Sequence, residues 1–352
     1  MRALIAATLA LVAVAQNATA QWMPQAGGTR IEYRGLSAVS PDVVWASGTH
    51  GSIAKTGDGG ADWLVTSIDS GSTLDLRAIV ARSATHAVAL SSGPAEQGQA
   101  RIFRTTDGAH WTQVYSTTQP GVFLDALAFW DDAHGIAMSD PVRGKLFLVA
   151  TDDGGATWTP IDTHDAPEML PGEAAFAASG TCIAVQGTSN VWIATGGGAR
   201  ARVFRSTDRG RTWSVADTPI HAGNSASGIF SIAFRDARHG VAVGGEYTKP
   251  KTPTDNVALT DDGGRTWRLA RGPLPVAYLS GVAYVPGADG RNVVAVGLAG
   301  TAISRNGGDS WMITDTTAYN SVAFASQTAG WTAGPAGRLA RWTGMPSPRG
   351  QR

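Results

Sequence analysis

Short apolar runs separated by polar turns recur along this 352-residue chain. Each of seven units carries two runs in which small residues alternate or run with β-branched and aromatic ones. This pattern is typical of strands that are buried on both faces. The first run of each unit, the expected innermost strand, covers residues 35–39, 76–80, 125–129, 173–177, 231–234, 281–284 and 321–324. The second run covers residues 43–46, 86–90, 135–138, 191–194, 240–243, 293–296 and 330–333.

Six units contain near-copies of one turn, which leads from Ser or Thr through Asp or Asn and glycine to Trp. The copy at residues 106–111 is one residue short, so a distorted turn is expected there. Glycine permits positive φ, the Asp or Asn side chain bonds to nearby backbone N–H groups, and the Trp buries a large apolar body. Such turns are Asp boxes, and they predict a structural role for Asp58, Asp107, Asp153, Asp208, Asp262 and Asn306.

The six Trp residues of these turns are 48, 47, 55, 54 and 44 residues apart. Repeats of this length, with such a turn between strands, indicate the blades of a propeller. We predict an all-β fold, a single seven-bladed β-propeller over residues 21–344. The seventh unit has a third strand at 337–342 and no strand after it, while residues 21–24 resemble the outer strands at 157 and 310. The N-terminal strand is therefore expected to complete the last blade and close the ring.

The two ends of the chain differ from the repeats. Residues 1–20 combine Arg2, an apolar run over 3–15 and the small residues Ala18-Thr19-Ala20, which is typical of a secretory signal peptide cleaved after Ala20. We expect a periplasmic or secreted protein with no membrane span after the leader. The tail at 345–352 is rich in Pro, Gly and Arg and is expected to be disordered.

Composition narrows the range of partners. With 28 Lys and Arg against 28 Asp and Glu, the formal net charge is zero, which disfavours a protein that coats nucleic acid. The chain has one cysteine, Cys182, whose apolar neighbours predict a buried strand position and no disulfide. A closed ring needs no second copy to fold, so a monomer is expected.

Polar residues that are not repeated mark the candidate site, since repeated residues serve the fold. They stand where first strands begin and where second strands end, and a propeller brings both to one mouth of its central channel. The predicted funnel residues are Arg34, Arg77, Asp125, Asp140, Glu173, Tyr247 and Lys249. Such a cluster suits a polar ligand or acid–base work, and it equally suits charges that neutralise one another beside water.

No metal or cofactor is expected. The seven histidines form no H-x-x-x-H or H-x-H pair, and His134 and His239 occupy matching turn positions. No G-x-G-x-x-G follows a strand, so a dinucleotide-dependent oxidoreductase is disfavoured.

The turn sequences are joined by a second set of motifs: Arg34-Gly-Leu36, Phe123-Leu-Asp125, Asp140-Pro141, Gly172-Glu173 and Gly244-Gly-Glu-Tyr247. Together they resemble exported bacterial relatives of the photosystem II stability/assembly factor, a family of Asp-box (BNR-repeat) propellers. The resemblance covers essentially residues 21–343. It implies a non-enzymatic propeller that binds a protein or peptide partner, with a membrane-protein assembly intermediate as one class of partner.

A glycoside hydrolase is the alternative, because sialidases also use Asp-box propellers. Their Arg-Ile-Pro opening is absent here, since Arg30-Ile31 is followed by Glu32, and they have six blades. No catalytic residue is assigned under the first interpretation. Under the alternative, two of Asp125, Asp140 and Glu173 would form the carboxyl pair that acts on a carbohydrate.

Overall fold

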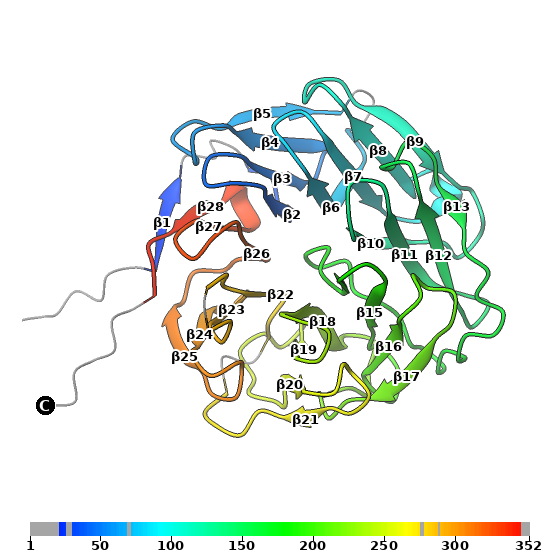
Figure 1. Ribbon diagram of the computed structural model, residues 1–352, viewed down its shortest axis with the longest axis vertical. Coiled ribbons are helices and arrows are strands. Elements are labelled where there is room, and N and C mark those ends of the chain that lie inside the picture. The colour runs from blue at the N-terminus through cyan, green and yellow to red at the C-terminus, as the bar shows by residue number, and fades with distance from the viewer. Residues whose placement is uncertain (1–20, 26–29, 69–71, 275–277, 288, 346–352) are drawn as a thin grey trace, which may run out of the picture.

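The computed structural model describes residues 21–25, 30–68, 72–274, 278–287 and 289–345. Its strands form seven antiparallel four-stranded sheets, set around a central axis as the blades of a propeller (Figure 1). The predicted signal peptide and all but the first residue of the predicted tail lie outside the described residues. The described part of the chain contains no helix long and apolar enough to cross a membrane.

Each blade is a meander whose first strand lies innermost, where it contacts the first strands of its neighbours. Blade 1 consists of β2 (Tyr33–Ala38), β3 (Val44–Gly48), β4 (Ser52–Thr56) and β5 (Leu64–Ser67). Blade 2 consists of β6 (Asp75–Ala81), β7 (Ala87–Ser92), β8 (Arg101–Thr105) and β9 (Thr112–Ser116). Blade 3 consists of β10 (Leu124–Phe129), β11 (Gly135–Val142), β12 (Lys145–Thr151) and β13 (Thr159–Pro160). A short 3₁₀ turn, η1 (Ala95–Gln97), lies between β7 and β8.

The other four blades follow the same order. Blade 4 consists of β14 (Ile183–Gln186), β15 (Asn190–Ala194), β16 (Arg202–Ser206) and β17 (Ser214–Asp217), and blade 5 of β18 (Ser227–Phe234), β19 (Gly240–Glu246), β20 (Val257–Thr260) and β21 (Arg268–Leu269). Blade 6 consists of β22 (Gly281–Tyr284), β23 (Val293–Gly297), β24 (Gly300–Ser304) and β25 (Met312–Asp315). Blade 7 consists of β26 (Ser321–Phe324), β27 (Gly330–Ala333), β28 (Leu339–Trp342) and β1 (Trp22–Gln25). A second 3₁₀ turn, η2 (Pro335–Gly337), precedes β28.

The N-terminal strand completes the seventh blade, as the sequence predicts. Strand β1 pairs with β28 from Trp22 opposite Trp342 to Gln25 opposite Leu339 (Figure 1). Trp22 is only 1% exposed, its ring lies 5.0 Å from that of Trp342, and its Nε1 donates to Thr301 Oγ1 at 2.9 Å. The first and last described strands are thereby joined, and the ring has no open sheet at its junction.

The Trp-ended turns share one set of hydrogen bonds. At Asp153, Thr151 Oγ1 donates to Oδ1 at 2.8 Å, and the backbone N–H groups of Gly155 and Thr157 donate to Thr151 Oγ1 and to Asp153 Oδ1. Trp158 then packs edge-on against the Phe129 ring at 5.9 Å. The corresponding bonds recur at Asp58, Asp208, Asp262 and Asn306.

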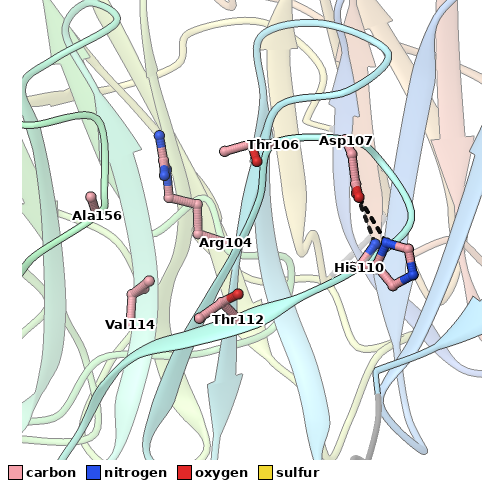
Figure 2. Close-up of a pocket in the computed structure, with 7 residues that line it drawn as sticks. All are labelled: Arg104, Thr106, Asp107, His110, Thr112, Val114 and Ala156. Atoms are coloured by element: carbon pink, nitrogen blue, oxygen red, sulfur yellow. Dashed lines mark hydrogen bonds and ion pairs between the residues drawn. The ribbon is translucent and has the colours of Figure 1, made fainter.

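The shortened second copy differs from the other five. Its hydroxyl comes from Thr105, where the sequence pattern had suggested Thr106, and Gly108 donates to it at 2.9 Å. Four of the other five copies have Ser or Thr directly before the Trp and the first has Asp62, whereas His110 takes this position here. Its backbone N–H and ring Nδ1 bond to Asp107 at 2.8 and 2.7 Å (Figure 2).

The fourth blade corrects the sequence analysis. Residues 173–177, expected to form its innermost strand, lie outside every sheet and make only an isolated bridge between Ala174 and Gly196. The innermost strand is β14, which begins directly after the buried Cys182. Residues 173–177 are Glu-Ala-Ala-Phe-Ala and β14 is Ile-Ala-Val-Gln, so both segments combine small and apolar residues and the local pattern does not separate them. Residues 174–181 therefore belong to no blade strand, and we call them the crossing segment.

Candidate functional site

One mouth of the central channel holds the candidate site. Because the strands alternate in direction, the starts of the first strands and the hairpins between second and third strands lie at this same mouth. They surround a cavity of about 450 Å³. Five of the seven predicted funnel residues line this cavity: Arg34, Arg77, Asp125, Asp140 and Tyr247.

The crossing segment runs over this mouth and touches blades on several sides. Arg77 Nη1 donates to Ala177 O at 3.4 Å and Arg34 Nη1 to Ala178 O at 3.3 Å, which attaches the segment to blades 2 and 1. On another side Ser179 Oγ donates to Ser280 O, next to blade 6, at 2.6 Å. Since residues 174–178 also line the cavity, the crossing segment supplies a fixed surface of main chain within the mouth.

Both arginines carry a partner two residues earlier in the chain. Arg34 Nη2 lies 2.6 Å from Glu32 Oε1, and Arg77 Nε lies 2.7 Å from Asp75 Oδ2. All four side chains are partly exposed. Each pair balances its own charge, and the guanidinium groups keep further N–H donors for other acceptors.

Two carboxyl groups lie deeper in the same cavity. Asp125 is 1% exposed, and its Oδ2 has no hydrogen-bond partner among the described residues. Burial raises the pKa of Asp125 well above its ordinary value, and the nearby charge of Asp140 raises it further. Burial also raises the pKa of Asp140 to about 6, although the N–H of Ala175 donates to its Oδ1 at 3.0 Å. Burial therefore favours the neutral form of both carboxyl groups.

Glu173 and Lys249 do not line the cavity. The Glu173 side chain is fully buried in a two-pronged ion pair with Arg202, whose Nε lies 2.9 Å from Oε1 and whose Nη2 bonds to Oε2. Thr195 Oγ1 and the N–H of Leu170 also donate to Glu173. Lys249 is mostly exposed and pairs with Glu246 at 3.0 Å. The acceptor oxygens of Glu173 are thus bonded within the protein, which indicates a structural role for this residue.

The cavity also has an aromatic side that the sequence analysis missed. Phe176 stacks on Phe230 with ring centroids 3.9 Å apart, and Tyr278 meets Phe230 edge-on at 4.8 Å. Leu298 also lines the cavity, and its neighbour Gly297 lies against the main chain of Tyr278. The available signal was an apolar residue in a hairpin, Leu298, beside the glycines at 297 and 300.

A second hollow, of about 470 Å³, lies beside the third and fourth strands of the second blade, and Figure 2 shows residues that line it. Its lining comes mainly from the β8–β9 hairpin, where Asp107 and His110 bond to one another. Arg104 Nε donates to Gly154 O at 3.2 Å, so its side chain links neighbouring blades. These side chains serve the turn and the blade contact, and we assign the candidate site to the mouth.

No group of three His, Cys, Asp or Glu side chains in the described ranges has the arrangement of a metal site. His134 and His239 instead bond through Nδ1 to Asp131 and Asp236, each at 2.9 Å. The buried Cys182 thiol lies 4.0 Å from Met138 Sδ, and burial raises its pKa. These groups therefore take part in turns and in the core.

Comparison with known proteins gives one relative in sequence. No family model matches the chain. The chloroplastic photosystem II stability/assembly factor HCF136 of Cyanidioschyzon merolae is 29% identical over 144 residues. This match covers 41% of the present chain and 28% of that relative, so more than two thirds of the relative lies outside it.

Solved structures match nearly the whole chain. YCF48 bound to D1 peptide has a TM-score of 0.63 at 14% identity, over 92% of this chain and 96% of that one. YCF48 from Cyanidioschyzon merolae gives 0.65 at 15% identity, over 92% and 99%. The WD40 β-propeller domain of Doa1 gives 0.61 at 12% identity, over 93% and 98%. The chain is thus similar to a photosystem II stability/assembly factor in part of its sequence, and to YCF48 in its propeller fold.

Proposed function

We propose that this chain is an exported, non-enzymatic propeller that binds a protein or peptide partner at the mouth lined by Arg34, Arg77 and Tyr247. The observation that carries the proposal is the cavity itself, in which hydrogen-bonding groups and aromatic rings converge on a fixed main-chain segment. One of the matching solved structures is YCF48 bound to D1 peptide, and this similarity supports a peptide ligand. A membrane-protein assembly intermediate is the partner class that the similarity to HCF136 favours.

The charge of the mouth also favours a peptide. Each arginine is offset by its own carboxylate, Arg34 by Glu32 and Arg77 by Asp75. A strongly anionic ligand such as nucleic acid would find little net attraction here. A peptide offers neutral carbonyl groups to the guanidinium donors and an apolar side chain to the rings.

Affinity purification from the native periplasm tests this proposal. Wild-type protein is compared with the Arg34→Gln/Tyr247→Ala double variant and with Lys249→Ala, whose side chain is exposed outside the cavity. We expect one partner, identified by mass spectrometry, to be retained by wild type and Lys249→Ala and lost by the double variant. Thermal denaturation should show that the double variant remains folded. Equal recovery by all three proteins would contradict binding at this mouth.

A glycoside hydrolase is the second candidate, and one observation favours it. Asp125 and Asp140 line the same cavity with raised pKa values, as a general acid requires. Glu173 is no longer a candidate, because its oxygens are bound by Arg202, Thr195 and Leu170. Turnover of an oligosaccharide that disappears in Asp125→Asn would establish this function, and inactivity on a broad glycan panel would count against it.

Residues 1–20 are proposed to be a cleaved signal peptide, with the mature monomer in the periplasm or secreted. The Trp-ended turns are proposed to be Asp boxes of the BNR type, on the basis of their shared hydrogen bonds. Fractionation and N-terminal sequencing check the first proposal, since the mature protein should begin at Gln21. An N-terminus at Met1 in the cytoplasmic fraction would contradict it.

A further inference from the structure

Two exposed apolar side chains stand at the mouth. Six large hydrophobic residues are exposed in the described part of the chain, and two of them line the cavity, Tyr247 (47% exposed) and Leu298 (37%). Tyr247 directly follows β19, and Leu298 lies in the two-residue turn that joins β23 to β24. Hairpin tips usually carry polar residues or glycine, so a leucine and a tyrosine at the rim of one cavity indicate a ligand contact.

Buried rings hold this part of the mouth in place. Phe230 is buried and contacts three rings, those of Phe176 at 3.9 Å, Tyr278 at 4.8 Å and Tyr247 at 6.2 Å. Because Phe230 and Tyr278 are covered, the surface left for a ligand consists of Phe176, Tyr247 and Leu298, called the apolar wall below. A wall backed by packed rings loses little side-chain entropy on binding, which favours specificity.

The shape of the mouth narrows the choice of occupant. The apolar wall lines a cavity of about 450 Å³, and a flat bilayer or the convex surface of a second ring does not enter a hollow of this kind. The same cavity is also lined by Arg34, Arg77 and two carboxyl groups, which need a ligand that makes hydrogen bonds. One apolar side chain on a peptide backbone supplies both contacts within that volume.

We propose that the apolar wall determines specificity by taking one apolar or aromatic side chain of the bound peptide, while its backbone lies toward Arg34. This inference rests on the proposed function and adds the chemistry of the residue that is recognised. Leu298 faces this side chain and selects for it, so a charge at position 298 changes the preference. Residues outside the cavity have no such effect.

Selection from a phage-displayed library of random linear peptides tests the inference. The baits are wild type, Leu298→Glu and the matched control Leu64→Glu, which places the same charge at an exposed leucine on the outer strand β5. Wild type and Leu64→Glu should enrich peptides with an apolar or aromatic residue at one fixed position. Leu298→Glu should bind the wild-type consensus peptide about tenfold or more weakly and should enrich Lys or Arg at that position.

Each outcome has a defined meaning. If Leu298→Glu and Leu64→Glu select the same peptides as wild type, peptide binding stands and the apolar wall is not the specificity site. If wild type enriches no peptide, both the inference and peptide binding at this mouth fail. Should Leu298→Glu not fold, as judged by circular dichroism, Tyr247→Ala replaces it. This variant should weaken binding of the consensus peptide about tenfold, and unchanged affinity would overturn the inference.

Discussion

Replacing Glu173 by Ala separates a structural role from a functional one. In the folded chain the Glu173 carboxylate is fully buried and bound by Arg202, Thr195 and the N–H of Leu170. The truncation leaves the guanidinium of Arg202, 8% exposed, without its counter-charge. Breaking a buried ion pair by removing one partner costs about 3–5 kcal/mol, chiefly through the charge that stays buried.

The size of the effect can be expressed as a melting temperature. Unfolding entropy near 2.1 cal/mol/K per residue, scaled to 352 residues, converts 3–5 kcal/mol into a fall of roughly 4–7 °C. Replacing both partners, as in Glu173→Leu/Arg202→Met, removes the unpaired charge together with the pair. Such replacements are often neutral, so the double variant should melt closer to wild type than Glu173→Ala does.

Differential scanning calorimetry and peptide binding are measured on the same proteins. The exposed pair of Lys249 with Glu246 provides the control, and Lys249→Ala should leave the melting temperature unchanged. The interpretation of Glu173 as structural is refuted if Glu173→Ala melts within 1 °C of wild type. A loss of peptide affinity at unchanged stability would place Glu173 in the binding site after all.

Three further substitutions test the closure, the buried carboxyl and the crossing segment. Trp22→Ala should lower the free energy of unfolding, measured by chemical denaturation, by about 3–5 kcal/mol, because the indole is buried where β1 closes the propeller. A loss under about 1 kcal/mol would contradict that closure. Burial raises the pKa of Asp140 to about 6, so the contribution of this carboxyl group to stability is lost as pH rises through about 4–6. Asp140→Asn should therefore gain about 2 kcal/mol of stability relative to wild type between pH 4 and pH 7, and a constant difference would refute the shift. Gly196→Ala would put the new Cβ 2.7 Å from a Phe176 ring carbon and should lower the free energy of unfolding by about 1–3 kcal/mol. Gly57→Ala is the neutral control, because its Cβ would meet no atom within 4 Å. Equal melting temperatures of the two variants would contradict the tight contact at Gly196.

The ring and its closure were predictable because they depend on a repeat. Each Trp-ended turn specifies one hairpin through local hydrogen bonds, so every blade carries its own signal. The N-terminal strand was predictable by subtraction, since the last unit lacked one strand and Trp22 began a matching one.

The departure at the fourth blade was not predictable from a local pattern. Residues 173–177 and β14 both have a strand-like composition, and a long-range contact favours the second. Gly196 and Gly228 approach so closely that a Cβ at either would lie within 2.6 Å of the other's Cα. This approach forms an isolated bridge between blades 4 and 5 at the start of the crossing segment. The two glycines lie far apart in the sequence, so a local sequence pattern does not reveal their contact. Which segment becomes the innermost strand of blade 4 therefore depends on tertiary structure.

Glu173 was assigned to the funnel for a related reason. A charged residue next to an expected first strand resembles Asp125, which does line the cavity. Whether such a carboxylate faces a ligand or an internal partner depends on Arg202, which is 29 residues away in the sequence. The aromatic rings were missed because Phe230 and Tyr278 look like ordinary core residues, and only their contacts with Phe176 and Tyr247 give them a place at the mouth.

Repeat length is a better guide to this site than residue type. The longest Trp-to-Trp spacing, 55 residues, runs from Trp158 to Trp213 and contains the crossing segment. The next, 54 residues, runs from there to Trp267 and contains Tyr247 in the long loop between β19 and β20. A blade needs no such additions to complete its four strands, as the shorter spacings of 44 to 48 residues show. Ordering additional residues costs conformational entropy, so the two longer segments indicate surfaces that the propeller fold itself does not require.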